Sequence, residues 1–121
     1  MKGNKMITTS MSSSDIKTLV QGIHVEATLA AVEAVQAFLA KYGEPMYCGF
    51  AWVKIPAKAS TKLGKALMDI GFTKSYNGGL TLYDPSNSMT QSMDLKEEGS
   101  RAYAAVFVKH GINAYMCSRA D

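Results

Sequence analysis

The segment Cys48–Ile55 constrains the fold more than any other part of the chain. It is a run of apolar, β-prone residues that only Gly49 and Lys54 interrupt, and it contains the only tryptophan, Trp52. Runs of this kind are typical of a strand that is covered on both faces of its sheet. We therefore expect this segment to be the central strand, buried on both faces, with the other elements arranged around it.

A short helix and a hairpin are expected after this strand. Apolar residues at helical spacing predict a helix over residues 60–70, with Ser60 as its N-cap. Two β-rich runs follow at residues 72–76 and 80–83. They are joined by Asn77-Gly78-Gly79, and Asn-Gly is the typical signal of a hairpin in which both turn residues have positive φ.

The last third of the chain predicts a second helix and a final strand. The helix begins at a capping box formed by Ser88 and Gln91, and Gly111 ends it. Residues 112–117 then alternate between small or polar and apolar types, as a strand does. The core side of the helix is expected to use four residues, Leu95, Ala102, Ala105 and Val106.

The order of elements from residue 46 predicts the fold class. It reads strand, helix, strand, strand, helix, strand, which is the split βαββαβ or ferredoxin-like arrangement. Right-handed crossovers then place both helices on one face of a four-stranded antiparallel sheet. We expect residues 46–121 to form this α+β sandwich domain, with an additional helix before it.

That N-terminal helix needs a partner for its apolar side. Residues 1–14 are expected to be a flexible tail and residues 15–43 a helical segment with apolar residues at steps of three and four. A break is expected near Gly22, because an unbroken helix would be longer than the domain needs. The apolar stripe is expected to cover the free face of the sheet or, failing that, to pack against a second copy of the chain.

Composition indicates a single self-sufficient domain. The chain has 121 residues, of which 47% are hydrophobic and 19% charged, and a net charge of +3 that permits contact with nucleic acid without requiring it. We interpret Cys48 and Cys117 as reduced core residues. We find no signal peptide or membrane span in the sequence, so we expect a cytoplasmic protein that does not bind membranes.

Blocks of residues between 46 and 121 resemble a family of small, uncharacterised proteins of tailed bacteriophages. They are Cys48-Gly49-Phe50-Ala51-Trp52-Val53, Tyr76-Asn77-Gly78-Gly79, Gln91-Ser92-Met93 with Lys96-Glu97, and Ile112-Asn113-Ala114-Tyr115 with Ser118-Arg119 and Asp121. The resemblance implies a phage product that works in an infected bacterium. The family has no assigned activity, so the resemblance implies no site residues.

The central strand carries the residues that could bind nucleic acid. Phe50, Trp52 and Lys54 alternate along it and share one face, and Tyr115 would lie beside them if the last strand pairs with the first. An exposed face of this kind would let unpaired bases stack, as in RNA-recognition domains. The alternative, which we favour from the sequence, is that the N-terminal helix packs on Phe50 and Trp52 and makes them core.

Basic residues near this strand could contact phosphate. Lys54, Lys58, Lys62 and Lys65 cluster around the start of the short helix, where an anion would find free backbone N–H groups. Such a cluster is otherwise simply a solvated face. Arg119 is expected to bind a phosphate or a carboxylate, or to form an internal salt bridge.

No motif in the chain predicts catalysis, a metal or a cofactor. Gly64-Lys65 lacks the other residues of a P-loop, and the two cysteines have no zinc-site spacing. Our first hypothesis is a non-enzymatic accessory protein that binds nucleic acid or a nucleoprotein complex. The alternative is a protein-interaction module that acts on a host or defence protein and oligomerises through its N-terminal helix.

Overall fold

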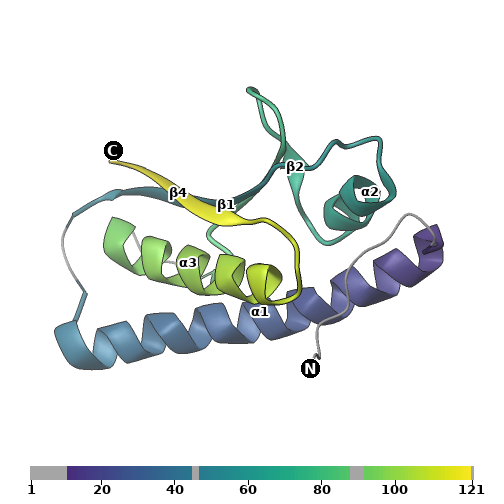
Figure 1. Cartoon of the computed structure of the whole chain (residues 1–121). Coiled ribbons are helices and arrows are strands. Elements are labelled where there is room, and N and C mark those ends of the chain that lie inside the picture. The colour runs from purple at the N-terminus through teal and green to yellow at the C-terminus, as the bar shows by residue number, and fades with distance from the viewer. Residues whose placement is uncertain (1–10, 45–46, 88–91, 121) are drawn as a thin grey trace.

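The computed structural model describes residues 11–44, 47–87 and 92–120. In chain order its elements are α1 (Ser13–Tyr42), β1 (Gly49–Ile55), α2 (Lys62–Asp69), β2 (Thr73–Lys74), β3 (Leu80–Tyr83), α3 (Met93–Lys109) and β4 (Tyr115–Ala120). The predicted fold class is confirmed: a four-stranded sheet is combined with helices in an α+β arrangement, preceded by an additional helix (Figure 1).

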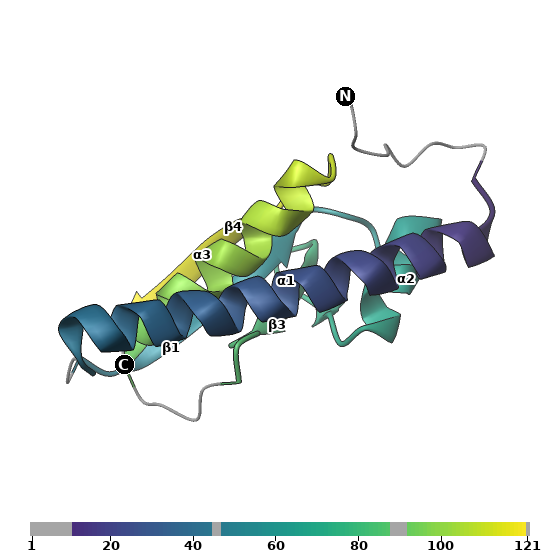
Figure 2. The same cartoon turned by 90° about the horizontal axis from the view of Figure 1, so that it is seen from below.

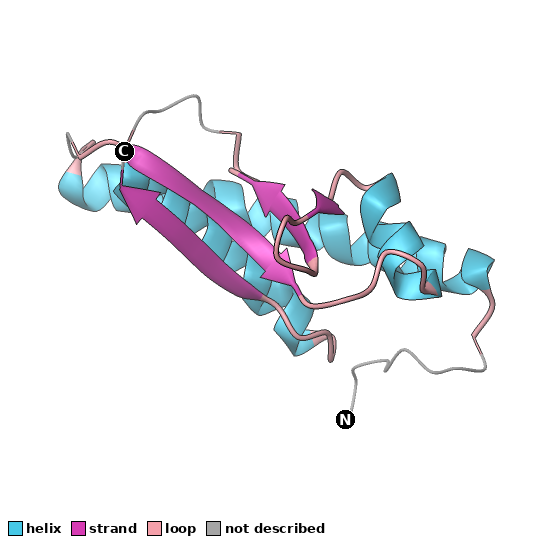
Figure 3. Ribbon diagram, turned by 90° about the horizontal axis from the view of Figure 1, so that it is seen from above, coloured by secondary structure: helices cyan, strands magenta, loops and turns pink. Residues whose placement is uncertain are grey.

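The sheet has the strand order β2-β3-β1-β4, and every neighbouring pair is antiparallel. This order is compatible with the predicted ferredoxin-like topology, and it places β1 inside the sheet. The helices lie together on one side of the sheet, so a view from the opposite side shows the strands in front of them (Figure 3). Among the described residues, one broad face of the sheet therefore carries no helix.

Burial along β1 alternates, which corrects the prediction that this strand is covered on both faces. Ala51, Val53 and Ile55 are buried toward the helices, whereas Phe50 is exposed and Trp52 partly exposed. The physical reason is the position of α1. This helix packs against α3 and α2 and not on the free face of the sheet, so the favoured interpretation of Phe50 and Trp52 as core is wrong.

Helix α1 runs without a break from Ser13 to Tyr42. Ser12 caps its start, because its hydroxyl accepts a hydrogen bond from the Asp15 backbone N–H at 3.0 Å, and Gly43 ends it with a φ of 74°. The expected break near Gly22 does not occur. The unbroken helix is long enough to cross both α2 and α3, as the view from below shows (Figure 2).

The interface of α1 with the helical layer belongs to the main core. Its buried side chains share one cluster with those of β1, α2 and α3, and they are Ile16, Val20, Ile23, Ala27 and Ala31. Polar contacts flank this cluster: His24 Nδ1 lies 2.7 Å from the Tyr103 hydroxyl. Glu26 pairs with Lys109, and its other carboxylate oxygen lies 2.8 Å from His110 Nε2. The apolar stripe of α1 thus finds its partner within the chain.

Helix α1 also has the length and composition of a helix that could cross a membrane. One stretch of 18 residues has a mean hydropathy of 1.3, and 22% of it is buried. The core helix of a soluble protein can have the same length and composition. The expectation that the protein does not bind membranes therefore stays a prediction.

Several local predictions are shifted by one or more residues. Helix α2 is capped by Thr61, whose hydroxyl accepts a hydrogen bond from the Gly64 N–H at 3.0 Å, and not by Ser60. In the hairpin, the residues with positive φ are Gly78 and Gly79, and Asn77 precedes them with an ordinary backbone. The turn is therefore closed one residue later than predicted.

The second half shows similar shifts. The final strand begins at Tyr115 and not at residue 112, because residues 112–114 connect the end of α3 to the sheet. Ala105 is exposed, and Tyr103 and Phe107 fill the core in its place. The predicted start of this helix at residues 88–91 lies outside the described residues, and Ser92 caps the observed helix.

The two cysteines are not core residues, in contrast to their interpretation from the sequence. Cys48 is exposed just before β1, and Cys117 is partly exposed on β4. Cys48 belongs to the run that was expected to be buried on both faces, and Cys117 to the predicted final strand. Since only one side of the sheet is covered, these positions remain accessible.

Candidate functional site

The free face of the sheet gathers aromatic and cationic side chains from three strands. On β1, Phe50, Trp52 and Lys54 alternate with the buried residues and so point away from the helices. The register places Arg119 opposite Phe50 and Tyr115 opposite Lys54. Residues directly opposite each other in an antiparallel pair share a face, so β1 and β4 contribute to one surface.

Strand β3 extends this surface on the other side of β1. Tyr83 lies opposite Trp52, and the two ring centroids are 5.1 Å apart at an interplanar angle of 34°. Phe50 is 40% exposed and Tyr83 is 59% exposed. These rings offer flat apolar surface to solvent on the two inner strands of the sheet.

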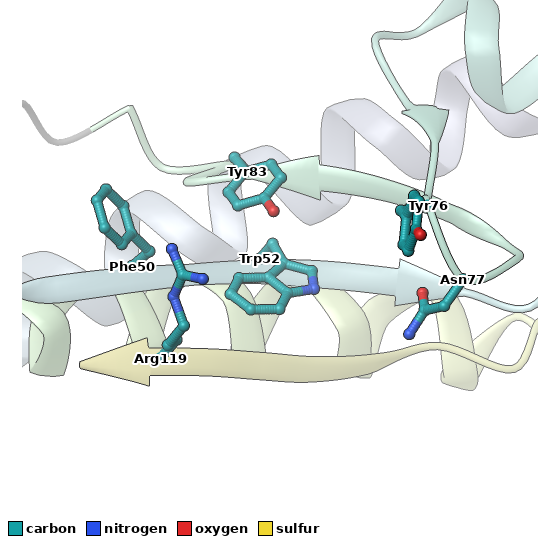
Figure 4. A pocket seen from close by; sticks show the side chains of 6 residues that line it. All are labelled: Phe50, Trp52, Tyr76, Asn77, Tyr83 and Arg119. Atoms are coloured by element: carbon teal, nitrogen blue, oxygen red, sulfur yellow. The ribbon is translucent and has the colours of Figure 1, made fainter. Parts of the chain in front are cut away.

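A pocket of about 600 Å³ lies over these rings. Its lining comes from β1, β3, β4 and the hairpin, and consists of Phe50, Trp52, Tyr76, Asn77, Tyr83 and Arg119 (Figure 4). Tyr76, in the hairpin loop, is fully exposed. Its ring stands at one end of the pocket while Phe50 and Arg119 lie at the other end, with Trp52 between them.

Cations border the pocket at the Phe50 end. The Arg119 guanidinium carbon lies 5.8 Å from the centroid of the Phe50 ring, and Lys96 Nζ lies 5.2 Å from it. Lys96 is held there because it also donates a hydrogen bond to the Gly49 carbonyl at 3.0 Å. These distances are those of cation–π contacts, so the aromatic ring and both charges occupy one place on the surface.

A second pocket, of about 320 Å³, adjoins the first at the hairpin. Lys54, Lys58 and Tyr115 line it, together with Asn77, whose side-chain oxygen accepts a hydrogen bond from Lys54 Nζ at 3.1 Å. No acidic side chain of the described part of the chain lines either pocket. The surface is therefore both aromatic and positively charged.

The structure brings together most of the predicted site residues and separates two of them. Those gathered on or beside the free face are Phe50, Trp52, Lys54, Lys58, Tyr115 and Arg119. Lys62 and Lys65 lie instead on α2, in the helical layer, and Lys62 Nζ donates a hydrogen bond to the Met11 carbonyl at 2.9 Å. The lysine cluster of the sequence is thus two separate groups in space.

Four residues of the surface were missed by the sequence analysis. Tyr76 and Asn77 lie in the hairpin that the sequence predicts. If that hairpin pairs with the central strand, its loop lies near the strand, and this signal could have identified both residues. Tyr83 and Lys96 reach the surface only through the pairing of β3 with β1 and the packing of α3. Their placement depends on which residues pair between the strands and on how α3 packs, and neither can be read from the sequence.

The groups with shifted pKa values lie away from this surface. Burial lowers the pKa of His24 and raises the pKa of Tyr103, and the two side chains meet between α1 and α3. The pKa of Glu26 is lowered, chiefly by its hydrogen bond to Lys109. Within residues 11–44, 47–87 and 92–120, no three His, Cys, Asp or Glu side chains are grouped so that they could hold a metal ion.

The fold and the surface define a class: an α+β protein whose sheet has one face packed on helices and one free, aromatic and basic face. Comparison of the chain with protein-family models, with curated proteins and with solved structures finds no match.

Proposed function

We propose that the protein is a non-enzymatic binding protein that holds single-stranded nucleic acid, alone or in a nucleoprotein complex, on the free face of its sheet. The observation that carries the proposal is the exposure of Phe50, Trp52 and Tyr83 on the inner strands β1 and β3. Unpaired bases stack on such rings irrespective of sequence, and four-stranded sheets with aromatic inner strands bind RNA in this way.

The charges around the rings support the same proposal. Arg119 and Lys96 flank Phe50, and Lys54 and Lys58 flank the hairpin. A strand whose bases stack on the rings would run its phosphates past these groups. The contribution of such contacts falls steeply as salt rises, because binding releases counterions from the nucleic acid.

The resemblance of residues 46–121 to small tailed-phage proteins gives the proposal its setting. We take the protein to be a phage-encoded accessory protein that acts in the cytoplasm of an infected bacterium. The packing of α1 on α2 and α3 supports its interpretation as a core helix and not as a membrane anchor.

A second candidate function is a protein-interaction module that acts on a host or defence protein. The observation that favours it is the outer side of α1, where Val25 is 59% and Leu29 61% exposed. Replacing both by serine leaves the core intact, since neither side chain contributes to it. Loss of a captured partner or of a homo-oligomer in this variant would favour the second candidate.

The experiment that tests the first proposal is a titration of labelled single-stranded and duplex oligonucleotides, followed by fluorescence anisotropy. We expect single strands to bind more tightly than duplexes, with affinity falling between about 50 and 200 mM salt. Absence of binding to single strands at the lower salt concentration would overturn the proposal.

A further inference from the structure

The two edges of the sheet differ in how far they are protected against pairing with another strand. At one edge β2 has only two residues, Thr73 and Lys74, and proteins commonly block sheet edges with short strands and lysines. At the other edge β4 has six residues without a proline, and within the described residues it pairs with β1 alone. The outer side of β4 is thus a strand edge about 20 Å long that can pair.

An apolar groove accompanies this edge. It has a volume of about 430 Å³ and lies between α3 and β4, lined by Ala104, Ala105, Val108, Ala114, Tyr115 and Met116 with Arg101. Val108 is 53% exposed. The one charged lining residue, Arg101, is paired with Glu98 on its own helix. A strand that paired with β4 would therefore lie beside an apolar groove.

We infer that β4 pairs with β4 of a second copy of this chain, antiparallel and about a twofold axis at Cys117, which makes one eight-stranded sheet. Residues opposite each other in such a pair share a face, and Tyr115, Cys117 and Arg119 all lie on the free face. Centring the axis on Cys117 uses nearly the full length of the strand. It also places each Arg119 opposite Tyr115 of the other copy.

The charges of β4 favour this self-pairing. Arg119 is the only charged residue of the strand, and the register about Cys117 keeps the two arginines apart and sets each beside an aromatic ring. On the opposite face the register sets Met116 against Ser118, and β4 itself brings no charge to that face. The partner that fits this edge is therefore the same strand in reverse.

The pairing has a consequence for the free face. A twofold axis between antiparallel edge strands stands perpendicular to the sheet, so both copies turn their free faces to the same side. The pockets over Trp52 in the two copies then belong to one continuous surface. A single strand of nucleic acid long enough to reach both would bind more tightly than one that fills a single pocket.

The test uses cysteine cross-linking of the full chain with a short bismaleimide, read by mass. Directly opposite Cβ atoms lie about 4.5–5.5 Å apart, so Cys117 is expected to cross-link to Cys117 of the second copy. The Cys48→Ser variant keeps Cys117 and should cross-link as the unchanged chain does. Cys117→Ser keeps Cys48 and should give no covalent dimer.

The register is tested in a background in which Cys48 and Cys117 are both serine. A mixture of Tyr115→Cys and Arg119→Cys chains is expected to cross-link at least about tenfold more than either variant alone, because only the mixture places two cysteines opposite each other. Val108→Glu puts a charge into the groove and, since Val108 is exposed, leaves the fold intact. It is expected to shift the chain to monomer in sedimentation equilibrium.

A chain that sediments as a monomer at all concentrations overturns the inference. This result is expected if residues 1–10 of the same chain, and not a second copy, occupy the outer edge of β4. A dimer that shows no Cys117 cross-link and that survives Val108→Glu also overturns it, and would point to the outer side of α1. Neither result bears on whether single strands bind.

Discussion

Trp52 and Tyr83 face each other across β1 and β3 on the free face of the sheet, with their ring centroids 5.1 Å apart. None of the described helices covers either ring, because α1 packs on α2 and α3. The pair forms the middle of the aromatic surface. The proposed function depends on this pair more than on any other contact, and the first prediction follows from it.

Replacing Trp52 by alanine is expected to weaken single-strand binding by about 1–3 kcal/mol, since one stacking surface is lost. The free energy of unfolding should fall by less than the roughly 3–5 kcal/mol typical of a buried tryptophan. Oligonucleotide titration and urea unfolding measure the two effects. A large loss of stability would show that Trp52 is core and would contradict the structure.

The second prediction concerns the cations. Arg119→Gln and Lys54→Gln are each expected to weaken binding and to lower the slope of log affinity against log salt by about 0.7, the value for one lost phosphate contact on a single strand. Lys65→Gln is the matched control, because Lys65 lies on α2, away from the surface. Equal effects of all three substitutions would mean that net charge, and not the surface, attracts the nucleic acid.

The third prediction compares two neighbouring residues of α1. Ile23 is 2% exposed and packs in the core, so Ile23→Ala is expected to cost about 2–5 kcal/mol in the free energy of unfolding. Val25, two residues later, is 59% exposed, and Val25→Ala is expected to stay within about 0.5 kcal/mol. Chemical unfolding of both variants checks the difference. Similar small losses would mean that α1 does not pack on α2 and α3.

The fourth prediction concerns pH. Burial lowers the pKa of His24 below its usual 6.5, so the unfolded chain binds the proton more readily than the folded chain does. The free energy of unfolding is therefore expected to decrease as the pH falls from 6.5 toward the folded pKa, and to be fully restored above 6.5. Urea unfolding at a series of pH values measures this slope.

Two variants test whether His24 is the cause of this slope. His24→Gln removes the titrating group and should flatten the slope, whereas Tyr103→Phe keeps the burial of His24 and should preserve it. The pKa of Glu26 is lowered from 4.5, so this group changes the free energy of unfolding only as the pH falls below 4.5. An unchanged slope in His24→Gln would assign the pH dependence to another group.

The element order and the fold class were predictable because they depend on local signals. The capping hydroxyl of Ser12, the terminator Gly43 and the apolar run of β1 each act within a few residues. Such signals are present in the sequence itself. The boundaries that moved lie at the ends of elements, which local patterns place only to within one or two residues; at Thr61 the neighbouring hydroxyls of Ser60 and Thr61 offer two caps, and the helix uses the second.

The position of α1 was not predictable from its periodicity. An apolar stripe shows that a helix needs a partner, but it does not say which surface of the rest of the chain that partner is. The small side chains Ala27 and Ala31 and the pair His24–Tyr103 fit the helical layer. These matches depend on side chains far apart in the sequence.

The candidate site was predictable only where it depends on local geometry. The alternation of Phe50, Trp52 and Lys54 follows from strand geometry alone. The addition of Tyr83 and Lys96, and the separation of Lys62 from Lys54, depend on strand register and on where α2 lies.

The most direct test of the account is the fluorescence of Trp52 during a titration with a single-stranded oligonucleotide at low salt. Trp52 is the only tryptophan, so its emission reports on the free face of the sheet alone. We expect the free protein to show red-shifted emission that iodide quenches, a saturable quenching on addition of the oligonucleotide, and recovery of the signal when salt is added. Blue-shifted emission that neither iodide nor the oligonucleotide changes would contradict the account.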